Sequence, residues 1–388
     1  MLTTPAVDSA AVAAPATTHE VVTWGASADR MGNAVPDRSY RLIVRTSAAG
    51  SGARIRLSNA FGDRPVTFGS AYSGLQKTGA ALIPGSNRRV TFGGSRSVTV
   101  AAGDTVLSDP LPGRLPAATA LVVSLHVSDA GGPATGHGMA MQTSYATTGD
   151  HTAEESADIW TERTGSWYYL DAVTVRTRPE TGAVVALGDS ITDGWQSSTG
   201  LNRRWPDYLA RRLRATDSTP VEGVANEGIS GNKVLADGAG QSALNRLQRD
   251  VLSHPGVRTV FLFEGVNDIK AHTGVTAQDM IAGYREIIDR THTAGKCIVG
   301  ATIAPFKGWY EWDAVAEAVR REVNEFIRTS GEFDAVTDFD RTLRSPYDAE
   351  RILPSFDGGD HLHPNDKGMQ AMADSVDIAS LICHRQPT

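Results

Sequence analysis

The hydrophobic pattern of this chain changes near residue 180. Before it, from Val21 to Val175, short runs alternate apolar and polar residues and end at Gly, Pro, Asp or Asn. Runs of period two are typical of strands in antiparallel sheets, and long stretches with helical spacing are absent from this part of the sequence. We therefore expect residues 21–178 to form an all-β sandwich of the jelly-roll type.

The pattern changes after Ala183. Apolar runs such as Val184–Leu187, Val260–Phe263 and Cys297–Ala301 show no alternation, as expected for strands buried on both faces of a parallel sheet. Segments with apolar residues three and four positions apart predict helices between and after these strands. They are Trp205–Ala215, Ala243–Leu252, Ala277–Ala294, Trp312–Thr329 and Asn365–Leu381. Residues 183–384 are therefore expected to form a separate α/β domain.

The charge and the apolar content exclude two kinds of partner. The chain has 37 Lys and Arg against 44 Asp and Glu, a formal net charge of −7, and its basic residues form no run. A nucleic-acid partner is therefore not expected. No segment reaches the roughly 20 continuous apolar residues of a membrane span, so we expect no membrane partner either.

The first 20 residues, rich in Ala, Thr and Pro, predict a disordered arm. They lack the basic start and the apolar block of a secretory signal, so a cytoplasmic protein is the default expectation. A secreted protein is the alternative if an upstream signal was removed. With only two cysteines, Cys297 and Cys383, we expect neither a disulfide framework nor a thiolate metal site, and we expect Cys297 to lie in the core.

Four short motifs in the second domain carry residues suited to acyl-transfer chemistry. The first, Gly188-Asp189-Ser190, follows an apolar strand, so its hydroxyl should lie at the carboxyl edge of the sheet, where open α/β sheets bind ligands. The second is a Gly-rich turn that contains Gly231. The third places Asn267 just after another apolar strand. A backbone N–H next to glycine and a neutral amide are both suitable donors to an oxyanion.

The fourth motif, Gly359–Asn365, contains Asp360 and His363 three positions apart. In a turn, this spacing lets the carboxylate orient one imidazole nitrogen while the other faces the cleft, as a Ser–His pair requires. His361 is expected to have a structural or rim role. A metal site formed by these residues with Asp357 is an alternative, but no other ligand cluster accompanies it, so we predict no metal and no cofactor.

In this order, the four motifs resemble those of the SGNH (GDSL) hydrolase family over roughly the last 200 residues. The resemblance implies a flavodoxin-like three-layer α/β/α sandwich with a parallel sheet. It also implies that Ser190, His363 and Asp360 form a catalytic triad, and that Ser190, Gly231 and Asn267 form the oxyanion hole. Actinobacterial members of this family commonly carry an N-terminal β-sandwich domain.

The resemblance predicts a serine esterase that forms an acyl-enzyme on Ser190 from a small-molecule ester or acyl thioester. One alternative is an acyltransferase that moves a group such as salicylyl onto a natural-product alcohol in antibiotic biosynthesis. Another is a carbohydrate-binding module attached to an inactive domain. Four loop residues could line the substrate pocket or instead pack the two domains together. They are Trp195, Lys307, Trp309 and Tyr310.

Overall fold

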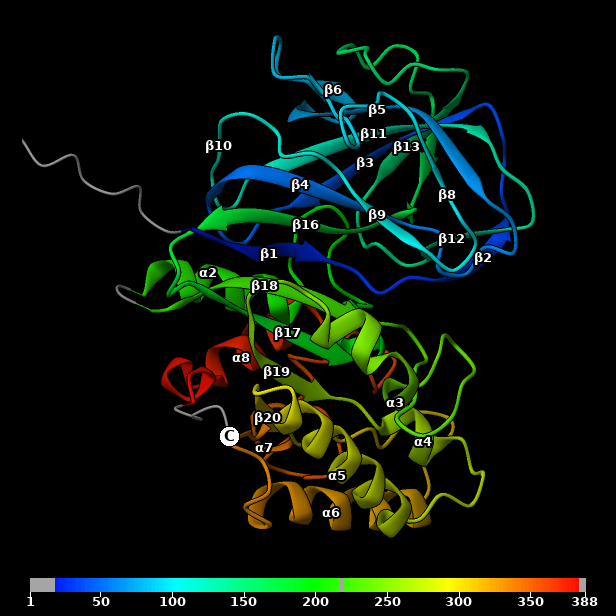
Figure 1. Cartoon of the computed structure of the whole chain (residues 1–388). Helices are drawn as coiled ribbons and strands as arrows, with labels where there is room; N and C mark the ends of the chain where they lie inside the picture. Colours follow the sequence, from blue (N-terminus) through cyan, green and yellow to red (C-terminus); the bar gives the residue numbers. More distant parts are fainter. Residues whose placement is uncertain (1–17, 217–218, 384–388) are drawn as a thin grey trace, which may run out of the picture.

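The computed structural model describes residues 18–216 and 219–383, which fold into a β domain and an α/β domain packed against each other (Figure 1). The predicted arm falls outside the described residues, except at its end. His19 and Glu20 already belong to the first strand because they pair with Thr177 and Arg176 of the last strand of the β domain. The first strand therefore starts two residues before the expected start of the domain.

The N-terminal domain consists of antiparallel strands, as the period-two pattern predicted. Its strands are β1 (His19–Gly25), β2 (Asp29–Asn33), β3 (Arg38–Arg45), β4 (Gly50–Ser58), β5 (Val66–Thr78), β6 (Ala81–Leu82), β7 (Arg88–Arg89), β8 (Val98–Val100), β9 (Thr105–Leu107), β10 (Arg114–Leu115), β11 (Ala120–Asp129), β12 (Pro133–His137), β13 (Ser144–Thr148), β14 (Glu162–Thr164), β15 (Trp167–Tyr168) and β16 (Leu170–Thr177). One sheet has the order β1-β16-β4-β10, a second β14-β13-β3-β11-β5-β6, and a third β15-β12-β2. Inward-facing residues of the two larger sheets form one apolar core, consistent with a β-sandwich.

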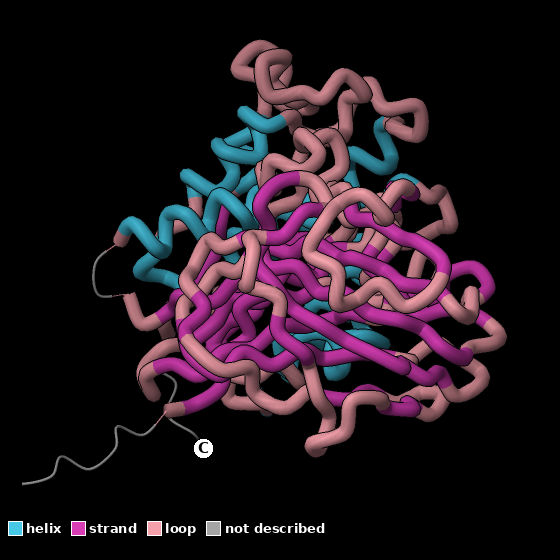
Figure 2. Tube along the Cα trace, turned by 90° about the horizontal axis from the view of Figure 1, so that it is seen from above, coloured by secondary structure: helices cyan, strands magenta, loops and turns pink. Residues whose placement is uncertain are grey.

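The α/β domain is built around one parallel sheet of five strands with the order β18-β17-β19-β20-β21. The strands are β17 (Gly182–Gly188), β18 (Val221–Gly228), β19 (Val257–Phe263), β20 (Cys297–Ala301) and β21 (Ala335–Thr337). The helices are α1 (Ser190–Asp193), α2 (Trp205–Ala215), α3 (Ala243–Arg246) with the π-helix η1 (Leu247–Leu252), α4 (Val266–Lys270), α5 (Ala277–Thr293), α6 (Ala314–Thr329), α7 (Phe339–Leu343), α8 (Asp366–Ser375) and the 3₁₀-helix η2 (Ile378–Leu381). In the described part of the chain, every helix belongs to this domain. Figure 2 shows the helices in cyan and the strands of both domains in magenta.

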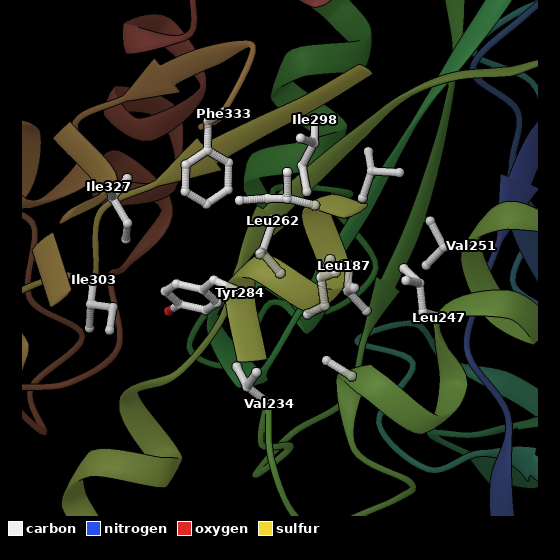
Figure 3. Packing of buried hydrophobic residues seen from close by; sticks show 14 of the residues in the cluster. Leu187, Val234, Leu247, Val251, Leu262, Tyr284, Ile298, Ile303, Ile327 and Phe333 are labelled. Carbon is white, nitrogen blue, oxygen red and sulfur yellow. The ribbon is translucent and has the colours of Figure 1, made fainter. Parts of the chain in front are cut away.

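Helices cover both faces of the parallel sheet, because its strands are apolar on both sides. Alternate residues of β17 belong to the cores on opposite faces of the sheet. Leu187 is in the cluster that includes residues of α3, η1, α5 and α6, whereas Ala186 is in the cluster that includes residues of α2, α7 and α8. Figure 3 shows the first of these clusters, in which Leu187 and Leu262 of the sheet lie among side chains from the helices and loops. None of the helices in the described ranges is both long and apolar enough to cross a membrane.

The two domains contact each other along β1 and β18, which lie next to each other in Figure 1. Val21 and Val22 of β1 are fully buried and belong to the core of the α/β domain. The backbone N–H of Val22 donates to Pro255 of that domain at 2.9 Å. The approach is so close that a Cβ at Gly223 would lie 2.4 Å from the carbonyl oxygen of Val22. The β domain is therefore part of one packed unit with the α/β domain.

The expectation about the cysteines was wrong. Cys297 of β20 is buried, as predicted, but it forms a disulfide with Cys383, with a Cα–Cα distance of 5.9 Å. The two cysteines are 86 positions apart in the sequence. The two cysteines meet because the last predicted helix does not continue to Leu381: it ends at Ser375, and Asp377 caps the separate η2, which lies against β20.

Candidate active site

The turn after β17 presents Ser190 at the carboxyl edge of the sheet. Asp189 caps α1 by accepting the N–H of Ile191 at 3.0 Å, so Ser190 is the first residue of that helix. Its N–H therefore has no partner within the helix and is available to a negative charge. A Cβ at Gly188 would lie 2.5 Å from the carbonyl oxygen of Phe263, so only glycine fits where the strand leads into the turn.

The structure brings Ser190, His363 and Asp360 into one hydrogen-bonded chain. The Oγ atom of Ser190 lies 2.8 Å from Nε2 of His363, and Nδ1 of His363 lies 2.7 Å from Oδ2 of Asp360. The other oxygen of Asp360 accepts the backbone N–H groups of Leu362 and His363 at 3.0 and 2.9 Å. The turn of residues 359–365 thus holds both the carboxylate and the imidazole, although Ser190 is 173 positions from His363.

The hydrogen bonds among Ser190, His363 and Asp360 define the tautomer of His363. Partial burial by itself would raise the pKa of Asp360, but hydrogen bonds from the ring and backbone of His363 and from the backbone of Leu362 lower it well below its ordinary value of 3.8. Asp360 is therefore ionised near neutral pH and accepts the Nδ1–H of His363. Nε2 then carries the lone pair that accepts the hydroxyl hydrogen of Ser190.

Gly231 and Asn267 follow the two strands on either side of β17. Gly231 has φ +81°, a conformation that favours glycine, and the N–H of Ile229 in the same turn donates to Gly188 at 3.0 Å. Asn267 is buried at the start of α4, and its side-chain amide donates to the carbonyl oxygen of Asn232 at 2.9 Å. The structure therefore brings both predicted oxyanion donors to the carboxyl edge on which Ser190 lies.

Asp268 connects the third motif to the second. Its carboxylate accepts the backbone N–H groups of Val234 and Leu235 at 2.8 and 3.0 Å. Since Val234 lies three residues after Gly231, these bonds hold the Gly-rich turn against the start of α4.

Arg246, which is fully buried in α3, was not among the predicted site residues. Its guanidinium donates to the carbonyl oxygens of Gly188 at 3.0 Å and Glu227 at 2.6 Å, to the side chain of Asn232 at 2.9 Å and to Ser27 of the β domain at 2.8 Å. This one side chain therefore ties the ends of β17 and β18 together behind the nucleophile. An arginine at an apolar position of an amphipathic helix was the only sequence signal for this role.

Two of the predicted pocket residues flank His363. The ring centroid of Trp195 lies 6.4 Å and that of Trp309 5.9 Å from the imidazole, both in edge-on arrangements. Tyr310 packs on Trp309 at 4.8 Å and is 80% exposed. Lys307 lies in the same loop as Trp309, but its ammonium group already pairs with two carboxylates at 2.8 and 3.1 Å.

The residues of the alternative metal site form two separate pairs. His361 pairs with Asp357 at 2.6 Å, whereas His363 pairs with Asp360. In the ranges that the structure describes, one group of three candidate ligand atoms lies close together, and its two sulfurs are bonded to each other. That group is Cys297, Asp334 and Cys383.

Comparisons with known proteins concern the α/β domain that carries these residues. Residues 186–371 match the model of the GDSL-like Lipase/Acylhydrolase family. The match supports assigning the α/β domain to the GDSL/SGNH lipase–acylhydrolase family, as the four motifs predicted. No curated protein matches the chain.

Several solved structures are similar to the α/β half of this chain. A lipolytic protein of the G-D-S-L family from Desulfitobacterium hafniense is 19% identical with a TM-score of 0.40, and the match covers 52% of this chain and 98% of that chain. A carbohydrate acetylesterase family member from Sinorhizobium meliloti and the aryl esterase of M. smegmatis are each 18% identical with a TM-score of 0.41, covering 50% of this chain and 95% of theirs. At such low scores, none of these likenesses bears on the substrate.

Proposed function

We propose that the protein is a serine esterase that forms an acyl-enzyme on Ser190. The observation that carries this proposal is the unbroken hydrogen-bonded chain from Ser190 through His363 to Asp360. A serine hydroxyl bonded to a neutral imidazole, with an ionised carboxylate on the other nitrogen, is the arrangement that activates serine as a nucleophile. Support also comes from the GDSL-like family match over the same residues.

In the first half of the proposed reaction, Nε2 of His363 removes the hydroxyl proton of Ser190 as Oγ attacks the ester carbonyl carbon. The carbonyl π electrons move to oxygen, and the N–H groups of Ser190 and Gly231 and the amide of Asn267 stabilise this oxyanion. When the carbonyl re-forms, the bond to the leaving alcohol breaks and His363 protonates its oxygen. The acyl group is then esterified to Ser190.

In the second half, His363 removes a proton from a water molecule, whose oxygen attacks the acyl carbon. The second oxyanion occupies the same place and collapses with cleavage of the bond to Ser190 Oγ, which takes the proton back from His363. The products are a carboxylic acid and the free enzyme. An alcohol in place of water would give transfer instead of hydrolysis by the same steps.

We propose that the substrate is a small-molecule ester with an apolar or planar group next to the scissile bond. Trp195 and Trp309 would contact this group, because both rings flank His363, and the exposed ring of Tyr310 would extend the surface outward. Lys307 would contribute by holding the loop that carries Trp309, since its charge is already paired.

We further propose that the protein works in an oxidising compartment. Structural disulfides persist outside the reducing cytosol, and the bond between Cys297 and Cys383 is therefore more compatible with the secreted alternative than with our default of a cytoplasmic protein.

Labelling with a fluorophosphonate, combined with hydrolysis of an aryl acetate, tests the proposed function. We expect the wild-type protein to react at Ser190 and to release the phenol, and we expect Ser190→Ala and His363→Ala to do neither. Ser253→Ala, at an exposed serine, is the matched control and should behave as wild type. Absence of labelling at any pH would contradict the esterase and favour a binding module on an inactive domain. Acyl release that depends on an added alcohol would identify an acyltransferase.

A further inference from the structure

A histidine of the β domain reaches the helix that carries the nucleophile. His137 ends β12, is 5% exposed, and places Nε2 at 2.9 Å from Oδ1 of Asp193. Asp193 is the last residue of α1, the four-residue helix that begins at Ser190. The β domain thus contacts the nucleophile turn directly.

The second oxygen of Asp193 holds the Gly-rich turn. Oδ2 accepts the backbone N–H of Ser230 at 3.0 Å and its hydroxyl at 2.9 Å. Ser230 directly precedes Gly231, so one buried carboxylate connects the nucleophile helix, the turn with the predicted oxyanion donor, and His137. The backbones are in close contact here: a Cβ at Gly228 would lie 2.3 Å from the nitrogen of Asp193.

The partners of His137 require a doubly protonated ring. Nδ1 lies 2.9 Å from the carbonyl oxygen of Ser27, and Nε2 lies 3.0 Å from that of Met139 as well as near Asp193. Carbonyl and carboxylate oxygens only accept, so both nitrogens must donate. Burial by itself would lower the pKa of His137, but the charge of Asp193 and these hydrogen bonds raise it to about 9.

We propose that His137 is a positioning residue for the oxyanion hole: it neutralises and orients Asp193, and Asp193 orients Ser230 and with it the N–H of Gly231. The inference rests on the proposed function, because it assigns Gly231 a part in catalysis. Without the imidazolium, the carboxylate would keep a buried charge with no cation bonded to it, and it would have to move or bind a proton. Either change displaces the turn. The β domain is in this way required for full turnover.

The variant His137→Gln tests this inference because it removes the positive charge and leaves a side chain that donates from one nitrogen only. Its control is His126→Gln, since His126 also pairs with a carboxylate, Asp37 at 3.2 Å, but within the β domain. We would measure kcat and KM for an aryl acetate, with kcat expressed per active site titrated by fluorophosphonate. A displaced oxyanion donor should lower kcat of His137→Gln roughly 10- to 100-fold with KM within about twofold, and the control should match wild type.

Titration of the active sites distinguishes a positioning role of His137 from a purely structural one. A purely structural role would reduce the number of titratable sites and leave kcat per site unchanged, and that result overturns the inference. If His137→Gln does not fold, Ser230→Ala takes its place. It removes one of the two bonds from Ser230 to Asp193 and should also lower kcat per site, and an unchanged value again overturns the inference. Ser190→Ala is measured in parallel: if it retains wild-type turnover, the proposed function itself is wrong and this inference falls with it.

Discussion

The side-chain amide of Asn267 donates one hydrogen to the carbonyl oxygen of Asn232 at 2.9 Å. The amide nitrogen carries two hydrogens, so the second is available to a substrate oxygen. Because Asn232 directly follows Gly231, this bond also fixes the distance between two of the proposed oxyanion donors.

We expect Asn267→Ala to lower kcat by about 10²–10³ with little change in KM, because the donor acts on the charge that develops in the transition state. The free energy of unfolding should fall by only about 1 kcal/mol, the contribution of one hydrogen bond. Steady-state kinetics and urea unfolding measure both effects. Asn33→Ala, at an exposed position of β2, is the control. A kcat within threefold of wild type would show that Asn267 is no oxyanion donor.

Asp360→Asn should leave the turn folded but lose the ionised acceptor for Nδ1 of His363. The amide can donate to that nitrogen and so stabilise the wrong tautomer, in which Nε2 carries the hydrogen and cannot accept from Ser190. We expect kcat to fall by about 10²–10⁴, by analogy with loss of the carboxylate in other serine triads. Asp374→Asn, at an exposed carboxylate, should keep wild-type kinetics. Equal kcat values for the two variants would contradict the triad.

Glu264 should make the free energy of unfolding depend on pH. Burial raises the pKa of Glu264 from 4.5 to about 8, although the guanidinium of Arg246 at 3.6 Å acts in the opposite direction. Its carboxyl oxygens are buried and accept no hydrogen bond from the residues that the structure describes. Between pH 4.5 and about 8 the folded state therefore holds a proton that the unfolded state has lost, and its stability falls as the pH rises.

We expect the neutral variant Glu264→Gln to lack this component, so its stability relative to wild type should increase from pH 4.5 to about 8. Urea unfolding at several pH values measures the difference. Glu325→Gln, at an exposed position of α6, is the control and should run parallel to wild type. Parallel curves for wild type and Glu264→Gln would show that Glu264 is ionised in the folded protein.

The disulfide should stabilise the fold without affecting the chemistry. It closes a separation of 86 residues, and loss of such a cross-link in Cys297→Ala/Cys383→Ala should lower the free energy of unfolding by about 2–4 kcal/mol. At a temperature where the variant is folded, kcat should be unchanged because neither sulfur contacts Ser190 or His363. If the wild-type protein has the same unfolding midpoint as the variant, and the same midpoint with and without reductant, the bond does not form in solution.

The two kinds of domain and the motifs at the strand ends could be predicted from local sequence patterns. Strand pattern and turn chemistry are properties of short windows, so the change near residue 180 separated antiparallel from α/β structure, and helix α2 has the predicted bounds, Trp205–Ala215. Asp360 and His363 lie 2.7 Å apart for the same reason, since the turn that joins them spans three positions. The order of the motifs along the chain then predicted the family that the α/β domain matches.

Which distant residues become buried together depends on how the elements pack in three dimensions. Arg246, the pair of His137 and Asp193, and the bond between Cys297 and Cys383 all join positions far apart in the sequence. Arginine, histidine and aspartate are ordinarily solvated, and apart from the apolar helix position of Arg246, their sequence neighbourhoods do not distinguish them from surface residues. Arg246, His137 and Asp193 become buried because the β domain packs on the α/β domain and excludes water from the strand ends, where an unpaired charge would be costly. The cysteines meet because η2 lies against β20.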